Sequence, residues 1–110
     1  MLLVADTSPL ISLLLIERLK LLDALYPGFI IPGAVYKELT NHNELKLFRS
    51  ELLALESHVR IVDPKELSTI LSIDEGEKEA IALYRQLQAD FLLIDDKKAR
   101  DVAQSMNYEH

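Results

Sequence analysis

The stretch that decides the fold opens the chain and reads MLLVADTSPLI, Met1–Ile11. Residues 2–5 form a short continuous apolar run, which is typical of a strand buried on both faces of a parallel sheet. The run ends at Asp6, and Ser8 and Pro9 then supply a favourable helix N-cap and first helical residue. The sequence therefore predicts a strand that ends in a carboxylate and is followed by a helix beginning at Pro9.

Two interpretations of Asp6 follow from this position. Open α/β sheets place their ligand sites at the carboxyl ends of strands, so a carboxylate there suits a functional site. Alternatively, Asp6 merely caps the helix that follows it. The number of other acidic residues that reach equivalent places in the fold decides between the two.

The composition bounds the class of protein. A chain of 110 residues with 49% apolar residues is expected to form one globular domain. The absence of cysteine excludes disulfides and thiolate metal sites and suits a reducing cytoplasm. Apolar runs such as residues 13–16 are too short to cross a bilayer, and Asp6 interrupts any signal-peptide pattern. We therefore expect a cytoplasmic protein that has no membrane partner.

The formal net charge of −6, from 18 acidic and 12 basic residues, argues against a simple nucleic-acid binder. A metal-dependent enzyme is not excluded, because divalent cations neutralise clustered carboxylates. The charge balance alone therefore leaves both classes open.

Strand and helix patterns alternate along the rest of the chain. Short apolar runs predict strands at residues 2–5, 29–31, 59–62 and 91–94, and helical patterns occupy residues 10–26, 34–40, 44–55, 65–70, 74–88 and 97–105. This alternation predicts an α/β fold in which a parallel sheet carries helices on both faces. Right-handed crossovers then bring the carboxyl ends of all strands to one edge. A further strand is expected after the last helix, and too few residues remain to form it.

Acidic residues recur at this predicted edge. Asp6 follows the first strand, and Asp95 and Asp96 follow the fourth. Glu38 lies beside the apolar stripe of the helix at 34–40, so we expect its side chain to point toward the edge of the core rather than into solvent. Three separate segments thus bring carboxylates to similar places.

Helix phase separates the acids of the helix predicted at 74–88. Glu77 falls inside the stripe of apolar residues, whereas Glu75 and Glu79 lie nearly opposite and are predicted to be solvent-facing charges. An alternative for Glu77 is the favourable placement of an anion at a helix N-terminus.

Several carboxylates at one edge repel one another unless a cation lies between them. Ligands that offer only oxygen suit Mg²⁺ or Mn²⁺, and such sites support phosphoryl transfer by activating water and stabilising the leaving oxygen. His42, His58 and His110 are scattered and are predicted to lie at the surface. The sequence contains no Gly-rich phosphate loop and no pattern of a Ser-His-Asp or Cys-His nucleophile site.

The chain resembles the PIN domain in four blocks that follow the order of the family, namely Val4–Ile11, Ile31–Leu39, Gly76–Ile81 and Leu92–Arg100. It is most similar to the bacterial and archaeal branch that includes the toxin nucleases of VapBC-type toxin–antitoxin pairs. The resemblance implies a three-layer α/β fold with a central parallel sheet. It also implies a single PIN-like domain over residues 1–110 that lacks the usual C-terminal strand and helix.

The resemblance further implies a metal-dependent ribonuclease that hydrolyses RNA phosphodiester bonds at a Mg²⁺ or Mn²⁺ site. The acids that match the family pattern are Asp6, Glu38, Glu77 and Asp96. Glu79 is a rival to Glu77, and Asp95 is a rival to Asp96 and a further metal ligand.

The implied partners are an RNA substrate, an antitoxin protein and a second copy of the chain in a homodimer. Lys97, Lys98 and Arg100 would meet an RNA backbone or form a solvated face, and no interleaved aromatic residues support base stacking there.

Two other functions compete with the nuclease. One is a catalytically inactive PIN-like module that binds an antitoxin or another protein. The other is a phosphoacceptor receiver domain, which fits less well because its acidic pair would follow the first strand rather than the fourth.

Overall fold

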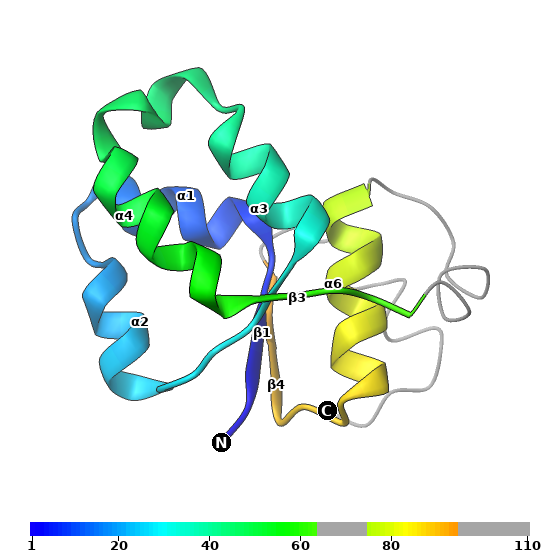
Figure 1. The fold of residues 1–110 in the computed structure, drawn as a ribbon. Coiled ribbons are helices and arrows are strands. Elements are labelled where there is room, and N and C mark those ends of the chain that lie inside the picture. The colour runs from blue at the N-terminus through cyan, green and yellow to red at the C-terminus, as the bar shows by residue number, and fades with distance from the viewer. Residues whose placement is uncertain (64–74, 95–110) are drawn as a thin grey trace.

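The computed structural model describes residues 1–63 and 75–94, and within them it contains the strands β1 Leu3–Ala5, β2 Ile31–Pro32, β3 Val59–Arg60 and β4 Phe91–Leu93 (Figure 1). β1, β3 and β4 lie within the predicted segments, whereas β2 shares only Ile31 with the strand predicted at 29–31 and extends to Pro32. The observed strands are short, so backbone pairing alone provides little of the stability, and packing on the two faces of the sheet carries the fold.

The described strands are parallel and β1 occupies the centre. Val4 in β1 pairs with Leu92 in β4, and Ile31 in β2 pairs with Val59 in β3. A parallel bridge between Val4 and Ile30 joins the two pairs, and the Ala5 N–H donates to the Ile30 carbonyl at 2.9 Å. The strand order is therefore β3-β2-β1-β4. The prediction of an α/β fold with a parallel sheet is confirmed.

The α-helices are α1 Thr7–Leu15, α2 Leu19–Leu25, α3 Gly33–Thr40, α4 Arg49–Leu55 and α6 Glu75–Gln86, and short 3₁₀ helices occupy η1 Asn43–Phe48 and η2 Glu56–His58. The single helix predicted at 44–55 is thus divided between η1 and α4. The helices predicted at 65–70 and 97–105, and the pair Asp95 and Asp96, lie outside the described residues. Within residues 1–63 and 75–94, no helix has the length and apolar character needed to cross a membrane.

Apolar side chains pack on both faces of β1. Leu3 and Ala5 belong to a cluster with residues of α1, α2, α3 and α4, whereas Val4 packs with residues of α6. All three are buried, as the continuous apolar run predicts. Figure 1 shows α6 on one side of β1 and β4, with α1, α2 and α4 on the other side. The central strand therefore links two hydrophobic clusters.

Helix α1 begins earlier than the sequence predicts. Asp6 occupies the N-cap position with ψ of 175°, and Thr7 rather than Pro9 is the first helical residue. The Asp6 N–H donates to the Leu93 carbonyl at 2.9 Å, so the sheet fixes where the strand ends. Pro9 is tolerated inside the first turn, because N–H groups there have no partner within the helix.

The continuous helix predicted at 10–26 is wrong, because α1 and α2 are separate. Glu17 adopts a left-handed φ of 58°. The Glu17 N–H donates to the Leu14 carbonyl at 3.0 Å and the Arg18 N–H donates to the Leu13 carbonyl at 2.8 Å, which is the Schellman pattern of a helix end. Glycine usually marks this position, so the glutamate gave no signal of a break.

The variant Glu17→Gly should raise the free energy of unfolding by about 1 kcal/mol, because a left-handed conformation is strained for a residue with a Cβ atom. Thermal unfolding should show the increase as a higher midpoint. The control is Glu56→Gly, where φ is −56° and the backbone is helical. That change should lower stability by about as much. A loss of stability in both variants would contradict the assignment of strain to Glu17.

Candidate active site

The candidate site lies at the carboxyl edge of the sheet. Asp6 stands at the end of β1, is only 2% exposed, and is held beside the end of β4 by its backbone bond to Leu93. Although Asp6 occupies the N-cap position of α1, its side chain makes no capping hydrogen bond. Asp6 therefore occupies the capping position, as one interpretation predicts, but a capping hydrogen bond does not account for its buried carboxylate.

Glu38 in α3 connects the first turns of two other helices. The Thr7 hydroxyl donates to Oε2 of Glu38 at 2.9 Å, and the Gly76 N–H donates to Oε1 at 3.1 Å. Glu38 is half-buried, as its place beside the apolar stripe of α3 predicts. Because Thr7 follows Asp6 and Gly76 precedes Glu77, these bonds bring three acid-bearing segments to one place.

Gly76 permits this close approach. A Cβ atom at residue 76 would overlap Oε1 of Glu38 and would lie 3.2 Å from the Thr7 hydroxyl oxygen. Thr7 and Gly76 contribute to the site through these contacts, and the sequence predicted a site role for neither residue. An isolated glycine inside a helical pattern was the available signal, since it weakens a helix by about 1 kcal/mol and often has a packing reason.

Helix phase predicts the exposure of two of the three acids of α6 correctly and that of the third incorrectly. Glu77 is 6% exposed and Glu75 is exposed, which confirms both predictions. Glu79 is half-buried and its Oε1 accepts a hydrogen bond from the Ala34 N–H at 3.0 Å, so the prediction of a solvent-facing charge is wrong. The reason is tertiary, because α6 packs against α3 and meets an N–H that α3 leaves without an intrahelical partner.

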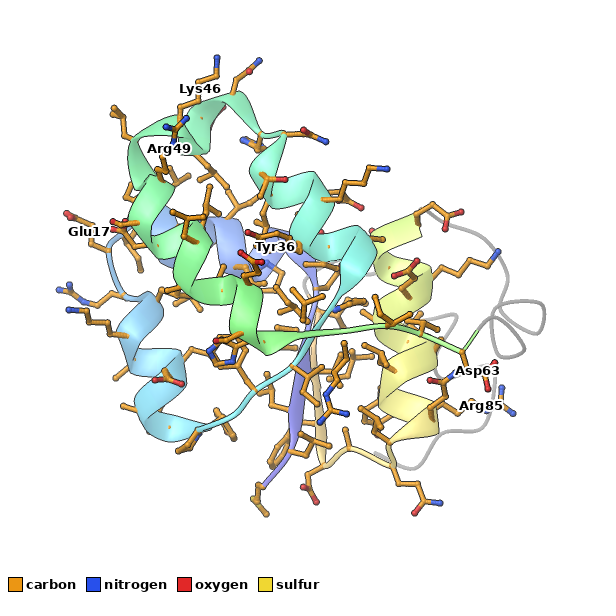
Figure 2. The ribbon with its side chains drawn as sticks, viewed as in Figure 1. Glu17, Tyr36, Lys46, Arg49, Asp63 and Arg85 are labelled. Atoms are coloured by element: carbon orange, nitrogen blue, oxygen red, sulfur yellow. The ribbon has the colours of Figure 1, made fainter. Side chains whose placement is uncertain are left out.

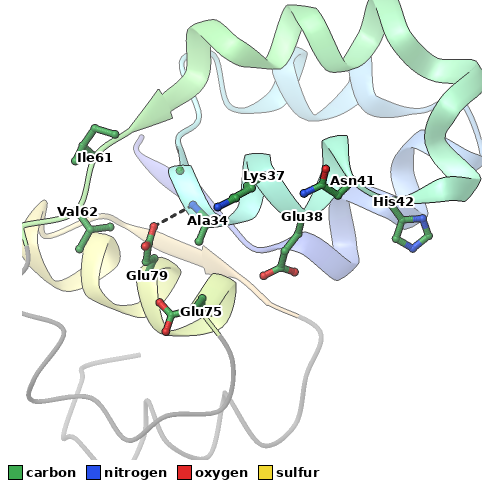
Figure 3. Close-up of a pocket in the computed structure, with 10 residues that line it drawn as sticks. Ala34, Lys37, Glu38, Asn41, His42, Ile61, Val62, Glu75 and Glu79 are labelled. Carbon is green, nitrogen blue, oxygen red and sulfur yellow. Dashed lines mark hydrogen bonds between the residues drawn. The ribbon is translucent and has the colours of Figure 1, made fainter.

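A pocket of about 740 Å³ opens between α3, the chain after β3, and α6 (Figure 3). Glu38, Glu75 and Glu79 contribute carboxylates to its wall. The remaining labelled lining residues are Ala34, Lys37, Asn41, His42, Ile61 and Val62. Among the described residues, the buried carboxylates of Asp6 and Glu77 do not line this pocket. The accessible part of the site is therefore formed by α3 and α6.

The structure brings the predicted acids together only in part. Within residues 1–63 and 75–94, no three acidic or histidine side chains are grouped closely enough to hold a metal ion. Asp95 and Asp96, the remaining predicted ligands, lie outside those ranges. The complete cation-binding cluster therefore stays a prediction.

The surface predictions for His42 and His58 both need correction. His58 is half-buried rather than at the surface: its ring stacks on Phe29 with centroids 4.1 Å apart, and Nδ1 lies 2.7 Å from the Phe29 carbonyl oxygen. Because a carbonyl only accepts, Nδ1 carries the proton in this contact. His42 is also half-buried and lines the pocket of Figure 3.

The variant Thr7→Val should lower the free energy of unfolding by about 1–3 kcal/mol, because it removes a hydrogen bond to a charged acceptor. Thr40→Val is the matched control, since its exposed hydroxyl bonds only the Lys37 carbonyl at 3.0 Å within the described residues. Urea unfolding measures both. The combination of Thr7→Val with Glu38→Gln should cost less than the sum of the single changes. Additive costs would show that the two side chains do not interact.

Comparison with known proteins identifies the family. A family model of the PIN domain matches residues 2–109, which is nearly the whole chain. Neither a search of curated proteins nor a search of solved structures gave a match. The match confirms the family that the sequence blocks resemble, while the toxin branch stays a prediction. The chain belongs to the PIN-domain family, whose members are generally nucleases.

Proposed function

We propose that this protein is a metal-dependent ribonuclease that hydrolyses phosphodiester bonds of RNA. The observation that carries the proposal is the position of Glu38, whose carboxylate accepts hydrogen bonds from Thr7 and Gly76. Those two residues are the chain neighbours of Asp6 and Glu77. These bonds join the segments that carry Asp6, Glu38 and Glu77 at the edge where α/β folds place their ligands.

A cation at this edge would stabilise two buried carboxylates. Asp6 is 2% exposed and Glu77 is 6% exposed, and ionised carboxylates removed from water are costly unless charge or hydrogen bonds compensate. The donor set consists of carboxylate oxygens, which suits Mg²⁺ or Mn²⁺ better than zinc or copper. The chemistry of the residues therefore fits the metal that the family commonly uses.

In the proposed mechanism, Asp6, Glu38, Glu77 and Asp96 would hold the metal, with Asp95 as a further ligand. A bound Mg²⁺ or Mn²⁺ supplies activation of water and stabilisation of the leaving oxygen.

The chain itself holds the ligands in place. Thr7 and Gly76 fix the orientation of Glu38 through their hydrogen bonds. Glu79 binds the Ala34 N–H and so fixes the start of α3, one turn before Glu38. We favour Glu77 over Glu79 as the ligand from α6, because Glu77 is buried and directly follows Gly76, whose N–H binds Glu38.

The biological setting forms a further part of the proposal. The similarity of the four sequence blocks to VapC-like toxins supports a toxin of a toxin–antitoxin pair that acts in the cytoplasm. In that setting the chain would bind an antitoxin protein and form a homodimer.

The central test is cleavage of RNA with and without Mn²⁺. Wild-type protein should cleave only when the metal is present, and Asp6→Asn should lose at least about two orders of magnitude in rate, as expected when a metal ligand is removed. The control Asp23→Asn makes the same chemical change on the exposed surface of α2 and should retain full activity. Equal metal-dependent cleavage by wild type and Asp6→Asn would overturn the assignment.

A catalytically inactive binding module is the second candidate, and one observation favours it. Both oxygens of Glu38 already accept hydrogen bonds from the protein, which is compatible with a purely structural role. Mn²⁺ at 100 times its dissociation constant should add roughly 2.7 kcal/mol to the stability of a metal-binding protein. A thermal midpoint that does not respond to Mn²⁺, in wild-type protein and Asp6→Asn alike, would favour the binding module.

The variant Gly76→Ala should separate site geometry from stability. The added methyl group must displace the Glu38 carboxylate, which is the end of a flexible side chain, while alanine improves the helix by about 1 kcal/mol. Thermal unfolding should therefore change little, whereas Mn²⁺-dependent cleavage should fall at least about tenfold, since small misplacements of catalytic groups are costly. The control Gly33→Ala meets only Ile61, at 3.8 Å, and should keep its activity. Full activity in Gly76→Ala would show that the position of Glu38 is unimportant.

A further inference from the structure

A second pocket lies on the neighbouring face of α3. It has a volume of about 500 Å³ and lies between α3, η1 and α4. The residues that line it are Tyr36, Thr40, His42, Leu45, Lys46, Arg49, Leu52 and Leu53. The volume is in the range of small-molecule sites. Among the described lining residues, this pocket shares only His42 with the pocket of Figure 3, which we call the acidic pocket after Glu38, Glu75 and Glu79.

This second pocket, which we call the cationic pocket, has a positively charged rim formed by Lys46 and Arg49, whereas the net charge of the chain is negative. Lys46 and Arg49 are exposed, and Figure 2 shows both side chains at the same end of the molecule. None of the described lining residues is acidic. Within the described part of the chain, neither cation forms an ion pair or hydrogen bond with another residue. Two free cations beside a pocket, in a chain of net charge −6, favour an anionic ligand.

The floor of the pocket is apolar. Leu45 and Leu52 are buried, and the ring of Tyr36 packs on the same hydrophobic cluster while remaining half-exposed. An apolar and aromatic floor with cations at the rim matches a nucleotide, whose base stacks on aromatic surface and whose phosphate attracts cations. A free inorganic anion would use the cations and would gain nothing from the floor.

The two pockets adjoin along α3. Tyr36 and Thr40, one helical turn apart, line the cationic pocket, whereas Lys37 and Glu38 line the acidic one. His42 lines both, and its Nδ1 is buried and makes no hydrogen bond with the described residues. A single nucleic-acid strand that passes His42 would reach both pockets.

We propose that the pocket formed by Tyr36, Lys46 and Arg49 binds one nucleotide of single-stranded RNA, next to the nucleotides that occupy the acidic site. The inference rests on the proposed ribonuclease function and assigns a substrate-binding surface to it. Lys46 and Arg49 bind the phosphate backbone, and Tyr36 stacks on a base. The surface increases affinity for longer RNA and plays no direct part in bond cleavage.

The test measures binding of a fluorescein-labelled single-stranded RNA of mixed sequence by anisotropy, with EDTA present so that binding is observed without cleavage. The double variant Lys46→Gln and Arg49→Gln should bind about tenfold more weakly. Its slope of log affinity against log salt should be shallower by about 1.4, which corresponds to two lost phosphate contacts. Tyr36→Leu should weaken binding roughly fivefold or more and leave the salt slope unchanged, because stacking involves no charge.

The matched control is the double variant Arg18→Gln and Lys20→Gln, which removes two exposed cations near the start of α2. Thermal unfolding confirms that each variant is folded. Equal affinity and equal salt slope in the two double variants would overturn the proposal. A changed oligomeric state of the Lys46 and Arg49 variant with unchanged RNA affinity would also overturn it, and would assign the surface to self-association.

Cleavage of a dinucleotide separates this inference from the proposed function. A dinucleotide is too short to need the second pocket, so the Lys46 and Arg49 variant should cleave it at the wild-type rate with Mn²⁺. Loss of RNA binding in the variant would support the surface even where wild-type protein shows no cleavage at all. Metal-dependent cleavage of long RNA that is the same in both double variants would support the nuclease and refute the surface.

Discussion

The carboxylate of Glu38, held between the Thr7 hydroxyl and the Gly76 N–H, is the interaction on which the site depends. Glu38 is 31 positions from Thr7 and 38 positions from Gly76 in the sequence, so both bonds are long-range. Both donors belong to the first turns of helices, where the helix dipole also favours a negative charge. One side chain therefore fixes how α1, α3 and α6 meet at the carboxyl edge of the sheet. The residues beside these donors, Asp6 and Glu77, are placed by the same contacts.

A second bond strengthens this arrangement from the opposite direction. Glu79 in α6 accepts from the Ala34 N–H in α3, while Glu38 in α3 accepts from the Gly76 N–H in α6. Each helix thus contributes a carboxylate that accepts a hydrogen bond from an N–H near the N-terminus of the other helix. This reciprocity resists sliding of α3 along α6. It explains why two glutamates with different predicted exposures both have structural roles, although only Glu38 also contacts the residue after Asp6.

The sequence predicted what depends on local burial and failed where a distant contact decides. The apolar run at residues 2–5 identified the central strand, and helix phase placed Glu38 and Glu77 correctly. Helix phase predicts which side of a helix faces the core. It does not predict which other segment of the chain packs against the opposite side. Glu79 was therefore misplaced, because only the packing of α3 supplies the Ala34 N–H.

Net charge did not predict the distribution of charge over the surface, because it averages over the two oppositely charged pockets on either side of α3. The acidic pocket and the cationic pocket lie on adjacent sides of that one helix, and His42 borders both. The carboxylates would repel the phosphates of an approaching RNA strand. At physiological salt this repulsion is screened beyond a Debye length of about 8 Å. Cations at Lys46 and Arg49 can thus attract phosphate locally despite an overall charge of −6. If RNA is the substrate, as proposed, a metal ion would be required only where the backbone enters the acidic site, and the two pockets would meet different electrostatic demands of that ligand.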